Sequence, residues 1–220
     1  MAVNASIFDI IGPVMVGPSS SHTAGAAKIA NVARRMVDPG FNEVEFYLHG
    51  SFAKTYKGHG TNRALVGGVL GYGPEDDRII NAFEYADEAG IGYKFIETDL
   101  GEVHPNTVRM VFKYPDDRKP IDIQGSSIGG GAIVINKIYG NPIEYYAQRP
   151  TLFMAYGEQK GIIAFVSNIL YSNGYNIHEM KTIKDGDDVM LVCQLDEPLN
   201  EEALETIKKG KDFTFIKYID

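Results

Sequence analysis

Apolar residues recur with a helical period soon after the start of the chain. Ala26, Ile29 and Ala33 fall on one stripe of a predicted helix, and polar and charged side chains fall on the other. The sequence DPG at 38–40 ends this helix. In VEFYLHG, residues 44–50, apolar and polar positions then alternate with the two-residue period of a half-buried strand.

The pattern continues as a mixture of helices and strands. A stretch rich in glycine leads into a helix that we expect to start near Thr61 or Asn62, since both residue types favour the first position of a helix. A second helix is expected from Pro74 to about Glu88, with acidic residues in its first turn. This region is therefore predicted to be a mixed α/β domain, with later strands at 92–97, 107–114, 121–124, 132–138 and 143–146.

A new pattern begins after AQRP, where a proline and polar residues interrupt the strands. We place a domain boundary there and expect one domain over 1–148 and another over 149–220. The order in the second is strand, helix, two strands around a DG turn, helix and strand, which is the βαββαβ ferredoxin-like unit. The fold class is therefore α/β in the broad sense, α+β, and Cys193 is expected in its core, on the same strand face as Leu191.

Composition and charge narrow the function classes. A hydrophobic fraction of 44% among 220 residues is enough for a real core, and disorder is not expected. The net charge of −8 offers no attraction for nucleic acid or anionic lipid. No apolar run is long enough to cross a membrane, and no signal peptide is visible, so we expect a cytoplasmic protein. A single cysteine excludes an internal disulfide and a cysteine-bound metal, so no metal site is assigned to this chain.

The stretch GPSSSHTAG, residues 17–25, is the first candidate for chemistry. Ser20 or Ser21 can cap the first helix, and the free amides of its first turn then favour an anion such as a carboxylate. His22 adds a group that moves protons near neutral pH. The alternative is that the serines only cap the helix and that His22 is solvated.

Two further motifs contain histidine. KGHGTN, residues 57–62, combines a cation, two glycines around His59 and a helix start, and it is either a second anion-binding loop or a plain turn. EVHPNT, residues 102–107, holds His104 extended before a proline and is typical of the lead into a strand.

The remaining candidates are weaker. GSSIGGGAIVI, residues 125–135, is a bulged hairpin or another anion-binding loop, and glycine within strands favours the hairpin. His178 is expected on the surface. By residue chemistry alone the chain is an α/β protein that binds a small anion.

Four motifs in order, SIFDIIGPVMVGPSSSHTAGAAKIANVARRM, YKGHGTNRALVGGVLG, VHPNT and GSSIGGGAIVI, resemble the beta chain of the bacterial iron-sulfur-dependent L-serine dehydratases over nearly the whole chain. The resemblance implies an N-terminal domain similar to the allosteric substrate-binding domain of phosphoglycerate dehydrogenase and a C-terminal ACT domain. It also implies effector-binding residues at Gly161, which opens the first ACT helix, and at Asn176 and Ile177, which open the second strand. At the loop before this helix, many ACT domains have an acidic residue, a spacer, a proline and a glycine. This chain has Glu158, Gln159, Lys160 and Gly161 there, so the proline is missing.

The family reaction removes water from L-serine and yields pyruvate and ammonia. It implies a [4Fe-4S] cluster, which this chain with one cysteine cannot hold, so the cluster belongs to a partner alpha chain. The resemblance implies catalytic roles for His22 and His59. The implied substrate-binding residues are Ser19, Ser20, Ser21, Thr23, Thr61 and Asn62.

Two other functions remain open. The chain could be a non-catalytic regulatory subunit that senses an amino acid and acts through its ACT domain, in which case the SSSHT motif binds the effector. A free-standing structural protein is disfavoured, since it does not need paired glycine and histidine loops. ACT domains commonly pair, so self-association through this domain is expected.

Overall fold

The computed structural model describes residues 14–220. Residues 6–13 of the first family motif lie outside the described part. The chain divides into two compact units, one ending at Tyr146 and the other spanning Ala147–Asp220. This division falls two residues before the boundary placed from the sequence.

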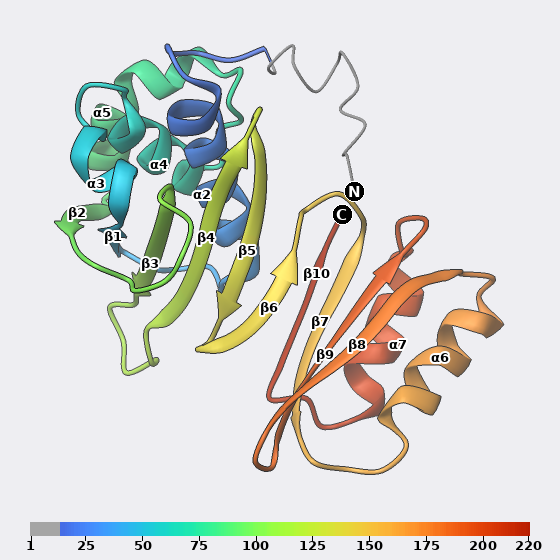
Figure 1. Cartoon of the computed structure of the whole chain (residues 1–220). Helices are drawn as coiled ribbons and strands as arrows, with labels where there is room; N and C mark the ends of the chain where they lie inside the picture. Colours follow the sequence, from blue (N-terminus) through green and yellow to red (C-terminus); the bar gives the residue numbers. More distant parts are fainter. Residues whose placement is uncertain (1–13) are drawn as a thin grey trace. The chain divides into compact units, whose positions relative to one another are not determined.

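The first unit is built on a six-stranded sheet of order β2-β1-β3-β4-β5-β6 (Figure 1). Strands β1 and β2 are parallel, and every other neighbouring pair is antiparallel. The strands are β1 (Glu43–Leu48), β2 (Gly92–Glu97), β3 (Thr107–Lys113), β4 (Ile121–Gly129), β5 (Ala132–Ile138) and β6 (Asn141–Tyr145).

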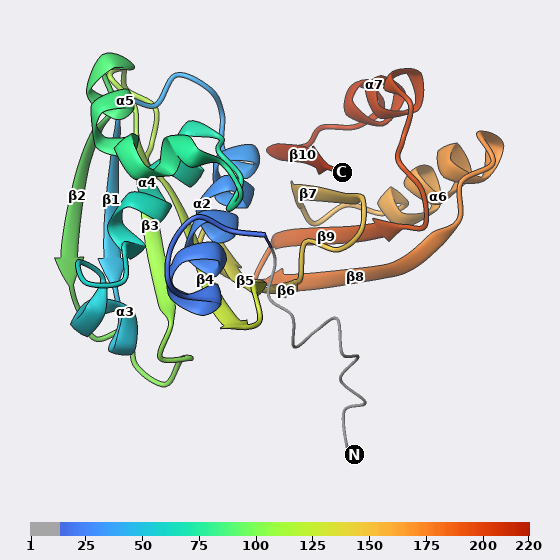
Figure 2. The ribbon, with the colours of Figure 1, turned by 90° about the horizontal axis from the view of Figure 1, so that it is seen from above.

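The described part of this unit has four α-helices, of which α2 and α4 lie side by side (Figure 2). A Cβ on Gly68 of α4 would lie 2.4 Å from the Ala27 carbonyl oxygen of α2, so the small residues allow the two helices to approach closely. The helices are α2 (Gly25–Met36), α3 (Gly50–Thr55), α4 (Thr61–Leu70) and α5 (Ala82–Glu88).

The expected helix from Pro74 to Glu88 is wrong in its first half. The chain instead forms a short 3₁₀ helix, Asp77–Asn81, before α5 begins. The Asp76 carboxylate accepts a hydrogen bond from the Arg78 amide at 3.0 Å, which starts the helical segment after Asp76 rather than at Pro74.

Strand β4 is longer than expected because it continues from Gln124 through Gly125 to Gly129 of the GSSIGGG motif, and Gly130 and Gly131 form the turn to β5. The pairing of β4 with β5 shifts register at Gln124/Gly125 and at Ser127/Gly129, so this motif is the bulged hairpin that the glycines predicted.

The second unit has the predicted βαββαβ order. Its strands are β7 (Thr151–Gly157), β8 (Ile177–Asp185), β9 (Asp188–Leu195) and β10 (Phe215–Ile219), and its helices are α6 (Ile162–Ser172) and α7 (Glu201–Gly210). The sheet order is β10-β7-β9-β8, with antiparallel neighbours throughout.

Local signals predicted several details of this unit correctly. The Asn200 side chain caps α7 by accepting from the Ala203 amide at 2.8 Å, and the turn between β8 and β9 uses Gly186 at a φ of +59°. Cys193 is fully buried in the core between the sheet and the helices, and His178 is exposed, as expected. No helix of the described residues is long and apolar enough to cross a membrane.

Candidate active site

The SSSHT motif forms a π-helical turn, Ser20–Ala24, directly before α2. The residue that caps this turn is Ser19, so the expected cap at Ser20 or Ser21 is wrong. Ser19 Oγ accepts from the His22 amide at 3.1 Å, and the Ser19 carbonyl accepts from the amides of Thr23 and Ala24 at 2.9 and 3.3 Å. Because of this wide turn, the helical segment is capped at Ser19, earlier than expected. Turns of this π-helical kind are frequent at functional sites.

Both ring nitrogens of His22 lie near hydroxyl groups. His22 Nε2 is 2.9 Å from Ser51 Oγ, and His22 Nδ1 is 3.4 Å from Ser19 Oγ. The edge of the ring contacts Phe52, with 5.5 Å between ring centroids. The alternative of a solvated His22 is therefore wrong, because the imidazole is half-buried among specific partners.

Sequence reasoning missed Ser51 and Phe52, which belong to the short helix α3. The available signal was the stretch HGSF at the end of a strand, where polar side chains often gather at functional sites. Gly50 has a φ of +56°, and a Cβ there would lie 2.7 Å from the Pro105 carbonyl oxygen. That carbonyl accepts from the Ser51 amide at 2.8 Å, so the VHPNT motif holds Ser51 against His22.

His59 lies beside His22, with 4.9 Å between the ring centroids. Its backbone is held by Thr23, whose hydroxyl donates to the His59 carbonyl at 2.9 Å. His59 Nδ1 is buried without a hydrogen-bond partner among the described residues. The structure thus brings together the SSSHT and KGHGTN motifs, which are separate in the sequence.

Burial is the main cause that lowers the pKa of His22 below its usual 6.5, and repulsion from His59 lowers that pKa further. A proton on one ring disfavours a second proton on the other. His22 is therefore neutral at neutral pH.

A cavity of about 320 Å³ adjoins the histidine pair. Its lining includes the polar residues Thr23, His59 and Asn62 and the apolar residues Ile79 and Phe83. Its volume lies within the range of small-molecule sites, which is about 300–1,000 Å³.

The other residues expected to bind substrate are not among those that line this cavity. Ser19, Ser20 and Ser21 are partly buried in the π-helical turn. Thr61 is the first residue of α4 and is fully buried, with its hydroxyl unpaired among the described residues. The left-handed residue before α4 is Gly60, at a φ of +67°, and no side chain caps this helix.

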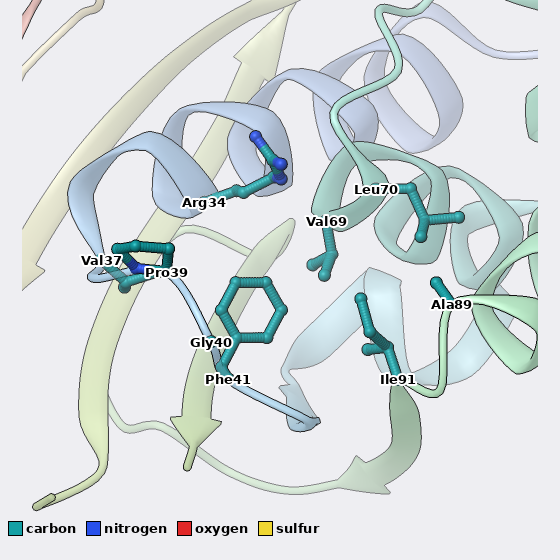
Figure 3. A pocket seen from close by; sticks show the side chains of 9 residues that line it. All are labelled: Arg34, Val37, Pro39, Gly40, Phe41, Val69, Leu70, Ala89 and Ile91. Atoms are coloured by element: carbon teal, nitrogen blue, oxygen red, sulfur yellow. The ribbon is translucent and has the colours of Figure 1, made fainter.

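A second cavity, of about 450 Å³, lies where α2, α4 and α5 end (Figure 3). Val37, Leu70 and Ala89 line it, and Arg34 is the only ionisable residue that residues 14–220 contribute to its lining. It contains no group that exchanges protons near neutral pH, so the histidine pair marks the better candidate for catalysis.

The residues expected to bind an effector are in the second unit. Gly161 precedes α6 in the left-handed conformation, at a φ of +86°, which explains a glycine at that position. Asn176 and Ile177 are exposed at the start of β8.

Comparison with known proteins agrees with the motifs. A family described as "Serine dehydratase beta chain" matches residues 6–89, which include both histidine motifs. The "L-serine dehydratase, beta chain" of Peptoniphilus asaccharolyticus is 50% identical over 218 residues, covering 98% of each chain. The "Probable L-serine dehydratase, beta chain" of Bacillus subtilis is 37% identical over 206 residues, covering 93% of each chain.

A longer relative matches in part. The "L-serine dehydratase" of Mycobacterium bovis is 30% identical over 158 residues, which cover 62% of this chain and 34% of that protein. Because two relatives match over nearly their full length and the motifs are shared, the protein belongs to the family of L-serine dehydratase beta chains.

Proposed function

We propose that this chain is the beta subunit of a two-chain enzyme that converts L-serine to pyruvate and ammonia. The reaction removes the α-proton and the β-hydroxyl group of serine as water, and the resulting aminoacrylate becomes pyruvate and ammonia by hydrolysis. The observation that carries the proposal is the His22–His59 pair, with 4.9 Å between ring centroids, beside a cavity of small-molecule size.

The histidine pair supplies a base for the α-proton. His59 lines the cavity and so is the ring that a bound substrate can reach. His22 lies behind it, oriented by Ser19 and Ser51. Because its pKa is lowered, His22 carries no positive charge near neutral pH that would oppose transfer of the α-proton to the neighbouring His59 ring.

The [4Fe-4S] cluster implied by the family does not fit the residues of this chain. Such clusters are held by several cysteine thiolates, whereas this sequence contains only Cys193. Cys193 is fully buried, and burial raises the pKa of its thiol to about 12. Within residues 14–220, no group of three or more histidine, cysteine, aspartate or glutamate side chains is placed to hold a metal ion.

We therefore assign the cluster to an alpha chain that contacts this subunit. The longer Mycobacterium bovis protein supports this assignment, because the alignment with this chain takes up only 34% of its length.

The test is to reconstitute the alpha–beta complex without oxygen and to measure pyruvate formed from L-serine. His22→Ala and His59→Ala should each lower kcat by roughly 10²–10⁴-fold, the usual contribution of a positioned acid or base. His178→Ala is the matched control, since His178 is an exposed histidine of the second unit. A loss below about tenfold would remove the altered histidine from catalysis.

For the two units we propose the finer relationships that the motifs imply. The first unit is similar to the allosteric substrate-binding domain of phosphoglycerate dehydrogenase, and the second is an ACT domain. The β10-β7-β9-β8 order and the left-handed Gly161 support the ACT assignment. Strand β8 is an edge strand, which makes it available for pairing with a second copy.

One alternative function is a regulatory subunit that binds an amino acid at the SSSHT motif and acts through the ACT domain, whose implied effector-binding residues are Gly161, Asn176 and Ile177. In that case the His22→Ala variant would change the response to effector while turnover at saturating L-serine persists. Steady-state kinetics with and without added amino acids separates this outcome from the loss of kcat expected of a catalytic histidine.

A further inference from the structure

The cavity beside His59 has an uneven distribution of charge. Lys57, on the segment that leads into α4, and Arg63, in the first turn of α4, both line it, and no acidic side chain does so among the described residues. The lining also contains the apolar side chains of Ile79, Ile80 and Phe83. A small ligand in this cavity would therefore meet both positively charged and hydrocarbon groups.

Neither cation has a carboxylate partner within residues 14–220. Lys57 Nζ lies 5.5 Å from the centroid of the Tyr56 ring, which is a weak contact. By contrast, Arg78 and Arg118 form ion pairs with aspartates two residues earlier in the chain. Two cations without acidic partners beside one cavity are notable in a chain with a net charge of −8.

The polar atoms around the cavity favour an anionic ligand with two oxygens. The Thr23 hydroxyl already donates to the His59 carbonyl, and Asn62 Oδ1 accepts from the Arg63 amide at 2.9 Å. The Asn62 side-chain nitrogen therefore remains as a donor, together with the ammonium and guanidinium groups. A guanidinium group binds a carboxylate through parallel hydrogen bonds, which an amide or a hydroxyl ligand cannot accept equally well.

We propose that Lys57 and Arg63 bind the carboxylate of L-serine in this cavity and so present its α-carbon to His59. The inference rests on the proposed function and adds to it the residues that recognise the acid group. It also moves the carboxylate away from the serines of the SSSHT motif, which do not line the cavity. Those serines instead shape the turn that orients His22.

The kinetic test uses Lys57→Gln and Arg63→Gln in the reconstituted alpha–beta enzyme. Each should raise the KM for L-serine by about 10- to 100-fold, the loss expected for one charge-assisted hydrogen bond, with kcat nearly unchanged. Arg63→Lys should recover part of the affinity because it restores the charge. Arg118→Gln is the control, since it removes the same charge from an exposed arginine already paired with Asp116. An unchanged KM in both glutamine variants overturns the proposal.

A binding test separates this proposal from the proposed function. The full beta chain is titrated with L-serine and with L-serinamide, which lacks the carboxylate, and the ring proton signals of His59 are followed by NMR. We expect L-serine to shift these signals and serinamide to leave them in place, and the shift should disappear in the double glutamine variant. Equal shifts with both compounds would overturn carboxylate recognition even if the enzyme deaminates L-serine. Selective shifts without any dehydratase activity would instead overturn the proposed function and leave the binding site standing.

Discussion

The contact between Gly25 and Ser127 allows a quantitative prediction. A Cβ on Gly25 of α2 would lie 2.1 Å from Ser127 Oγ and 2.7 Å from Ser127 Cβ on β4. Ser127 cannot move away freely, because its amide donates to the Asn106 carbonyl at 3.0 Å. Gly25→Ala must therefore push α2 away from the sheet. Such overpacking costs about 1–3 kcal/mol in the free energy of unfolding, which corresponds to a fall of roughly 2–12 °C in Tm.

Differential scanning calorimetry of the beta chain measures this loss, and a double variant tests its cause. Ser127→Gly removes both atoms that the new Cβ would meet, so Gly25→Ala should cost little in that background. Gly157→Ala is the matched control, since a Cβ there has nothing within 4 Å. The reasoning is refuted if Gly25→Ala melts like the wild type, or if its penalty is the same with and without Ser127→Gly.

Four further outcomes follow from single residues. Ser127→Ala should stabilise the protein by up to about 1–3 kcal/mol in urea denaturation, because the buried Ser127 hydroxyl has no hydrogen-bond partner in the part of the chain that the structure describes; a clear loss would contradict this. The pKa of His22 is lowered on folding, so the unfolded chain binds more protons just below pH 6.5, and the free energy of unfolding should fall as pH decreases through that range. His22→Gln should flatten that part of the profile, and an unchanged slope would count against the assigned shift. Cys193, whose thiol pKa is raised to about 12, should react with a thiol reagent at pH 8 only after denaturant is added, and rapid reaction of the native protein would refute its burial. Ser51→Ala should lower kcat with little change in KM, and Ser51→Thr should restore part of it; equal activity of all three proteins would show that the hydroxyl does not position His22.

Secondary structure could be predicted wherever the signal lies within a few residues. Three features set by neighbouring side chains were predicted correctly. They are the Asn200 cap, the DG turn at 185–186 and the position of Cys193 on the buried face of its strand. Helix α3 was missed because it has only six residues, and its first amides bind the carbonyl of Pro105 far along the chain. The serine that caps the first turn was misplaced because a π-helical turn shifts the hydrogen bonds by one residue.

The sequence by itself identified the kinds of group present: two histidines in motifs rich in glycine and serine, a single cysteine and a βαββαβ pattern. These features were readable because side-chain chemistry and hydrophobic periodicity are local properties. Only the tertiary structure decided that His22 and His59 lie 4.9 Å apart, that Ser51 reaches His22, and that Lys57 and Arg63 share a cavity with His59. Those distances depend on how α2, α3 and α4 pack together, and packing is determined by contacts between residues that no local pattern connects.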